Sequence, residues 1–132
     1  GFIEIGRFGD QDIAAHGKLP QAVTLSTLSE KISRTLLRKP MLVGDPDKSI
    51  QKIAWCTGAA QSYFEAAIQQ GIDAFITGEI SEQTVHIARE SGVAFIAAGH
   101  HATERYGVQA LGDHIAQQFN IQHQFIDIEN PV

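Results

Sequence analysis

Residues 93–104 read VAFIAAGHHATE, an apolar run that leads into two histidines and a glutamate. The apolar part, residues 93–98, predicts a short buried strand, and a helical pattern begins at Thr103. This order is typical of a strand-to-helix unit in an α/β fold. Polar side chains that directly follow such a strand lie where open α/β sheets bind their ligands.

His100 and Glu104 are four residues apart across this turn, so both side chains can point toward one position. An imidazole and a carboxylate together suit a divalent ion such as Zn, Mn, Fe or Ni. The pair makes only half of a metal site, and a lone histidine in a turn is usually structural. His101 must point elsewhere, as a group that orients a ligand, a substrate contact or a surface residue.

Strands and helices alternate along the chain. From Ile50 onward, strands are predicted over 53–57, 72–77, 93–98 and 124–128, and helices over 61–70, 81–90 and 103–119. The earlier part predicts strands at 2–8, 22–25 and 41–43, turns at 9–12 and 17–20, and a helix over 28–37 that begins near Thr27. We therefore expect an α/β fold with a mixed, partly parallel sheet.

Length and composition indicate one α/β domain over 1–132, with 50–132 as its regular core and 1–49 as a less regular part. The net charge of -5 has no basic cluster, which argues against unaided nucleic-acid binding. No apolar run approaches the ~18 residues of a membrane span. The first residues also lack the features of a signal peptide. We expect a cytoplasmic protein.

Three further side chains have competing interpretations. Glu79 follows the strand predicted at 72–77, where a carboxylate can ligate metal, transfer protons or complement a helix dipole. His86 and Glu90 repeat the four-residue spacing in the middle of a predicted helix, which favours a solvated helix face. The single Cys56 excludes an internal disulfide, and its apolar surroundings predict a buried thiol.

Four segments together resemble the C-terminal half of the Nif-three-like family. They are AWCTG (54–58), DAFITGEISEQT (73–84), AAGHHATER (97–105) and FIDIENP (125–131). The resemblance covers essentially the whole chain, is most specific over 50–132, and is closest to gamma-proteobacterial members. These members are known as GTP cyclohydrolase 1 type 2 homologues.

The resemblance implies a protein about twice this length, built as a duplicated two-lobed fold with a dinuclear metal centre between its halves. It also implies a toroidal homohexamer with two divalent ions per full-length subunit. His100 and Glu104 match the second-half ligands of the family, whereas the first-half ligands have no counterpart here. The start at Gly1 and the lone Met41 agree with a C-terminal piece, for which we expect weak metal binding.

For the parent protein, the resemblance implies metal-dependent hydrolysis of a small substrate such as a nucleotide, with no membrane partner. Two ions would lower the pKa of a bridging water. Glu79 and His101 are the candidates for catalytic acid/base or substrate-orienting groups. The alternative is a ring-forming scaffold or metal-binding adaptor, such as a metallochaperone, whose metal is structural or regulatory. A ring that threads DNA is disfavoured by the negative charge.

Overall fold

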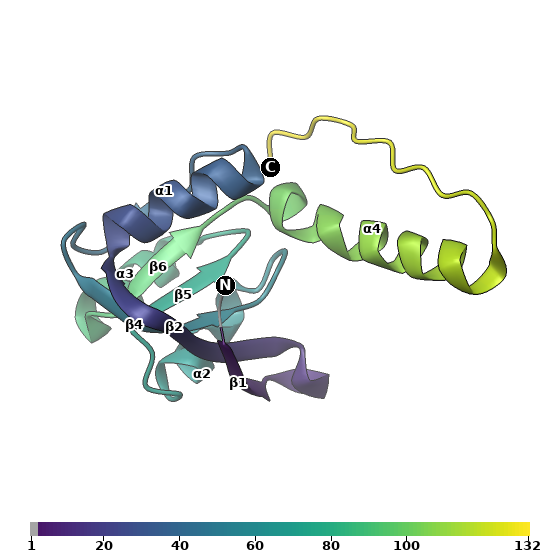
Figure 1. Ribbon diagram of the computed structural model, residues 1–132. Coiled ribbons are helices and arrows are strands. Elements are labelled where there is room, and N and C mark those ends of the chain that lie inside the picture. Colours follow the sequence, from purple (N-terminus) through teal and green to yellow (C-terminus); the bar gives the residue numbers. More distant parts are fainter. Residues whose placement is uncertain (1–2) are drawn as a thin grey trace.

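A mixed six-stranded sheet forms the centre of the computed structural model, which describes residues 3–132 (Figure 1). Across the sheet the strands are β1 (Ile3–Phe8), β2 (Ala14–Thr24), β4 (Ser49–Trp55), β5 (Ala74–Thr77), β6 (Ala94–Ala97) and β3 (Met41–Val43). The pairs β4–β5 and β5–β6 are parallel, and all other pairs are antiparallel. The predicted mixed, partly parallel sheet is confirmed. Phe2, the first residue of the strand expected at 2–8, lies outside the described residues.

Helices cover both faces of this sheet. One face carries α1 (Leu25–Leu36), and the opposite face carries α2 (Phe64–Ile68) and α3 (Glu82–Ser91) (Figure 1). The α1 side buries Leu25, Leu28 and Ile32 against Ile53, Ile76 and Ile96. On the other side, the rings of Phe64, Phe75 and Phe95 pack together. Successive residues of β5 and β6 thus supply the two cores alternately, as the period of a strand requires.

The turn expected at residues 17–20 does not form, because β2 continues through it. A Cβ on Gly17 would clash with the carbonyl oxygen of Ile3 in β1, so this glycine permits close pairing of the two strands. The pairing of β2 with β4 changes register between Lys18 and Val23, and this irregularity accommodates Pro20. The strand predicted at 22–25 is the end of β2.

Several predicted helix boundaries are also corrected. The α1 helix begins at Leu25 because Thr24 is its cap, and Oγ1 of Thr24 accepts a hydrogen bond from the N–H of Thr27 at 3.2 Å. The helix expected over 61–70 is a 3-10 turn (Gln61–Tyr63) followed by the short α2. The α3 helix follows Ser81 and ends before Gly92, as predicted.

The long helix α4 (His100–Phe119) projects from the body, and the chain then returns alongside it (Figure 1). We call residues 121–132 the return segment. The strand expected at 124–128 is not formed, because no described strand lies beside it to complete a ladder. No helix in the described part of the chain is both long enough and apolar enough to cross a membrane.

Candidate metal centre

The loops that follow β4, β5 and β6 meet at the carboxyl ends of these parallel strands. The N–H of Gly78 donates to the carbonyl oxygen of Gly58 at 2.9 Å, and the N–H of Gly99 donates to that of Gly78 at 2.9 Å. These bonds continue the parallel pairing beyond the strands. The three loops are therefore held in a fixed register where α/β sheets bind ligands.

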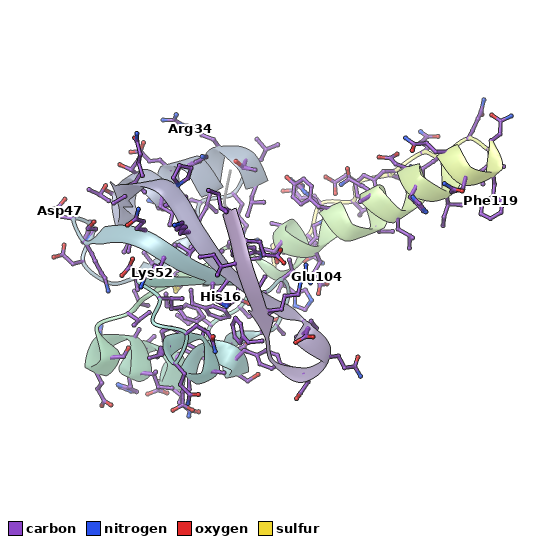
Figure 2. The ribbon with its side chains drawn as sticks, turned by 60° about the horizontal axis from the view of Figure 1, so that its bottom comes forward. His16, Arg34, Asp47, Lys52, Glu104 and Phe119 are labelled. Carbon is purple, nitrogen blue, oxygen red and sulfur yellow. The ribbon has the colours of Figure 1, made fainter. Side chains whose placement is uncertain are left out.

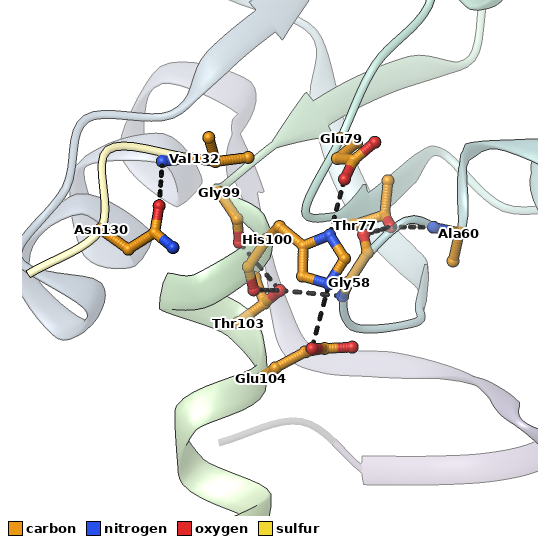
Figure 3. A network of polar contacts seen from close by, with 10 residues as sticks. All are labelled: Gly58, Ala60, Thr77, Glu79, Gly99, His100, Thr103, Glu104, Asn130 and Val132. Carbon is orange, nitrogen blue, oxygen red and sulfur yellow. Dashed lines mark hydrogen bonds and ion pairs between the residues drawn. The ribbon is translucent and has the colours of Figure 1, made fainter. Parts of the chain in front are cut away.

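Two threonine hydroxyls hold the loop after β4 from both sides (Figure 3). The buried Oγ1 of Thr77 donates to the carbonyl oxygen of Gly58 at 3.1 Å and accepts from the N–H of Ala60 at 3.3 Å. The Oγ1 of Thr103 accepts from the N–H of Gly58 at 3.0 Å and lies 2.9 Å from the carbonyl oxygen of Gly99, to which it can donate. Gly58 is thus tied to β5 and to the first turn of α4.

His100 and Glu104 converge, as the sequence predicted. The α4 helix begins at His100, three residues before the expected start, because Gly99 makes the turn with a φ of 99°. The Nε2 atom of His100 lies 3.0 Å from Oε2 of Glu104 (Figure 3). Two ligand atoms that each lie about 2.0–2.2 Å from one ion are about 3 Å apart at a right angle. The separation therefore fits shared coordination of a single divalent ion.

Two glycines make room for this pair. Gly58 has a φ of 70°, and a Cβ there would clash with the carboxylate of Glu104 and lie 3.3 Å from Nε2 of His100. A Cβ on Gly78 would lie 2.7 Å from the Cα of His100. The sequence analysis missed Gly78 and Thr103 as residues that shape the site. An available signal was the Thr-Gly pair at the end of two successive predicted strands, at 57–58 and 77–78.

Glu79 reaches the opposite side of the same imidazole. Its Oε1 lies 2.6 Å from Nδ1 of His100, and both side chains are about one third exposed. This hydrogen bond raises the pKa of His100 above its ordinary value, and the Glu104 carboxylate adds to the rise. Histidines that ligate metals commonly donate their second ring N–H to a carboxylate in this way.

His101 turns away from this cluster. Its Nε2 lies 3.2 Å from Oδ1 of Asp127 in the return segment, and the other oxygen of Asp127 accepts from Arg105 at 3.0 Å. The structure therefore separates His101 from His100, as expected for adjacent helical residues. It links His101 to the C-terminal end of the chain.

The interpretations of His86 and Cys56 are confirmed. His86 is exposed on α3 and lies 3.9 Å from a carboxylate oxygen of Glu82, so it belongs to a solvated helix face. Cys56 is buried, and burial raises the pKa of its thiol, with a smaller contribution from the charge of Glu104. Neither side chain joins the His100 cluster.

The described residues therefore present two donors toward one position, Nε2 of His100 and the Glu104 carboxylate. Within residues 3–132, no group of three or more His, Cys, Asp or Glu side chains has the arrangement of a metal site. Glu79 is close, but it contacts the ring nitrogen that faces away from Glu104. The residues present fit part of a metal centre, not a complete one.

The fold and this arrangement define a mixed α/β protein with a histidine–carboxylate pair at the ends of its parallel strands. Residues 2–131 match the family described as Duf34/NIF3 (NGG1p interacting factor 3), and the chain belongs to this family. The resemblance seen in the sequence is thereby confirmed.

The curated relatives that the chain matches are about twice as long as the chain. A Neisseria meningitidis serogroup B protein named GTP cyclohydrolase 1 type 2 homolog is 48% identical over 131 residues, which are 99% of this chain and 53% of that protein. A Pseudomonas aeruginosa protein of the same name is 53% identical over 121 residues, covering 92% of this chain and 48% of the relative. The chain spans about half the length of these curated relatives.

Solved structures of longer proteins also contain this fold. A protein described as ybgI, of unknown function, superimposes with a TM-score of 0.93 at 44% identity, covering all of this chain and 53% of that chain. A Bacillus cereus protein related to NIF3 gives a TM-score of 0.77 at 26% identity, over 90% of this chain and 35% of that one. This coverage agrees with one half of a duplicated two-lobed fold.

Proposed function

We propose that this chain supplies one half of a dinuclear divalent-metal centre, with His100 and Glu104 as ligands. The supporting observation is the 3.0 Å separation of Nε2 and Oε2 where three strand-end loops meet. A mixed nitrogen and oxygen donor set suits Zn, Mn, Fe or Ni. Two ions per full-length subunit would draw their other ligands from the half that the relatives carry beyond this chain.

Glu79 orients His100 in this proposal. By accepting the N–H of Nδ1, its carboxylate selects the tautomer in which the Nε2 lone pair faces Glu104. This contact supports a positioning role for Glu79. An acid/base role for Glu79, which the sequence suggested, stays a prediction. The corresponding role for His101 has less support because its ring contacts Asp127.

We infer that the full-length protein hydrolyses a small substrate such as a nucleotide. Bound divalent ions would act as Lewis acids and lower the pKa of a nearby water. The nucleotide class rests on the name of the relatives, because no residue of this chain identifies guanine. A cytoplasmic location and a toroidal homohexamer belong to the same proposal and rest on the family resemblance.

A non-catalytic scaffold or metal-binding adaptor is the second candidate. The edge strand β1 favours it, because Ile3 and Ile5 are 51% and 60% exposed there, and an apolar sheet edge is suited to assembly. In a scaffold, the ion bound by His100 and Glu104 would be structural or regulatory. The two candidates share the metal ligands and differ in turnover.

Calorimetric titration with Zn or Mn tests the shared part of the proposal. We expect this chain to bind weakly, because two protein ligands leave an ion mostly hydrated. The full-length protein should bind two ions, and His100→Ala or Glu104→Gln should remove most of this binding. His86→Ala is the control, because His86 lies on α3 outside the cluster. Tight two-ion binding by this chain alone would contradict the half-site proposal.

Turnover separates the enzyme from the scaffold. The full-length protein should hydrolyse nucleotide or phosphoester substrates only with added metal, and His100→Ala should abolish the reaction while leaving assembly intact. Metal binding and normal assembly without turnover of any of these substrates would favour the scaffold.

A further inference from the structure

The helix α4 carries an apolar stripe that the described chain leaves largely exposed. Val108, Leu111, Ile115 and Phe119 are spaced by three and four residues, so they share one helix face. All four are exposed, Phe119 at 73%. Phe119 lies at the far end of the helix from Glu104 (Figure 2), and only Ala102 of α4 is buried. The helix therefore leaves the body after its first turn with its apolar side exposed.

The return segment has the features of an unpaired strand. Asp127 contacts His101 and Arg105 of α4, whereas its neighbours Ile126 and Ile128 remain 71% and 75% exposed. No backbone group of residues 122–129 bonds to another backbone group of the described chain. Extended residues with free backbone groups and exposed isoleucines form an edge to which a sheet can pair.

The helix and the return segment are nevertheless held together. The Nδ1 atom of His123 lies 3.0 Å from Oδ1 of Asp113. A Cβ on Gly112 would clash with the His123 ring, so this glycine permits the close approach. At the other end, the carbonyl oxygen of Val132 accepts from the N–H of His101 at 3.1 Å. We call α4 and the return segment together the arm.

The projecting position of the arm is retained in a longer protein. The solved structure of ybgI matches all of this chain with a TM-score of 0.93. The arm comprises residues 100–132, one quarter of the chain, and a displaced arm would not permit that score. Within the described chain the base of the arm is held by Arg105 and Tyr106, which donate to the carbonyl oxygens of Leu36 and Thr35 at the end of α1. No such contact reaches the outer turns of α4, so contacts that cover the stripe there must come from outside the described chain.

We propose that the arm is a helix–strand unit that completes the sheet of a second α/β half. Residues 124–128 pair with an edge of that sheet, and the stripe Val108, Leu111, Ile115 and Phe119 packs on its face. The partner that the arm binds is the half that the relatives carry beyond this chain. Because that half is covalently linked to this chain in the full-length protein, its effective concentration at the arm is high. The proposal does not depend on bound metal, so its test is separate from the metal titration.

Hydrogen–deuterium exchange tests the proposal on two metal-free proteins, this chain and the full-length protein that also contains the second half. We expect amides 122–128 to exchange rapidly in this chain and at least about tenfold more slowly in the full-length protein, because ladder bonds protect amides. Equally rapid exchange in both proteins would overturn the proposal. The amides of β5 serve as an internal reference for folding.

Variants of the full-length protein identify the contacts. The double substitution Ile126→Asp with Ile128→Asp should restore rapid exchange in the return segment, and Leu111→Asp should weaken protection there. Gln122→Asp and Gln117→Asp are matched controls, since both positions are exposed and Gln117 lies on the opposite face of α4 from the stripe. If protection instead appears in this chain alone as its concentration rises, with dimers in sedimentation, a second copy is the occupant and the proposal is wrong.

Discussion

The Nδ1 atom of His100 lies 2.6 Å from Oε1 of Glu79, although the two residues are 21 positions apart and follow different strands. The parallel pairing of β5 with β6 brings their carboxyl ends together, and this places the two loops side by side. Glu104 contacts the other ring nitrogen from within α4. One imidazole thus connects two strand-end loops with the first turns of a helix.

Replacing Glu79 with Gln should lower the pKa of His100, because the hydrogen bond to the carboxylate is the largest cause of its upward shift. NMR titration of the imidazole in the metal-free chain measures this. Loss of the orienting carboxylate should also weaken metal binding by the full-length protein, about 10- to 100-fold. Glu82→Gln is the control, as Glu82 lies beside His86. An unchanged His100 pKa in Glu79→Gln would remove the positioning role.

Gly58→Ala should damage the site, and Gly71→Ala should not. Both glycines have a φ near 70°, so each substitution costs about 1–2 kcal/mol of stability through backbone strain. Only at Gly58 would the new Cβ meet Glu104 and His100; nothing lies within 4 Å of a Cβ on Gly71. We therefore expect similar strain costs in chemical unfolding, with metal affinity of the full-length protein reduced only by Gly58→Ala. Equal loss of affinity in both variants would contradict the close fit at Gly58.

Thr77→Val should destabilise the chain by about 1–3 kcal/mol, because it leaves the N–H of Ala60 without its hydroxyl acceptor. Urea unfolding measures the change. Thr35→Val is the matched control, because the Thr35 hydroxyl donates to its own helix at an exposed position. Its cost should stay within about 0.5 kcal/mol. Equal losses of stability in the two variants would contradict the role of the buried Thr77 hydroxyl in holding the loop after β4.

The buried thiol of Cys56 should make the chain less stable at alkaline pH. Burial raises its pKa in the folded chain, so the unfolded chain releases this proton first as pH rises. The contribution of the thiol is fully present below the ordinary thiol pKa of 9.0 and is lost as pH rises toward the folded value. Urea unfolding at a series of pH values should show a steeper alkaline decline for the native chain than for Cys56→Ala. If the stability of both proteins declines equally with pH, the Cys56 thiol has the same pKa in the folded and the unfolded chain, and the prediction is wrong.

The sequence was informative where a local pattern decides the structure. The apolar runs at 72–77 and 93–98 gave buried strands, and the four-residue spacing brought His100 and Glu104 to one position. Helix periodicity and strand hydrophobicity act between near neighbours, so they can be seen in a linear pattern. The family resemblance likewise rests on short contiguous motifs.

Features that depend on distant neighbours were missed. Turn-forming residues at 17–20 lie inside β2, because β1 approaches Gly17 closely and the pairing with β4 is irregular near Pro20. Residues 124–128 have the composition of a strand, yet a strand requires a partner for its backbone, and the described chain provides none.

The sequence by itself determined the alternation of strands and helices and the His100–Glu104 pair. Only the tertiary structure decided that Glu79 holds Nδ1 of His100, that His101 belongs with Asp127, and that Gly58 and Gly78 make room for the site. The physical reason is that hydrogen bonds and steric fit between loops depend on which strands are neighbours in the sheet. That neighbour relation is set by packing of the whole chain.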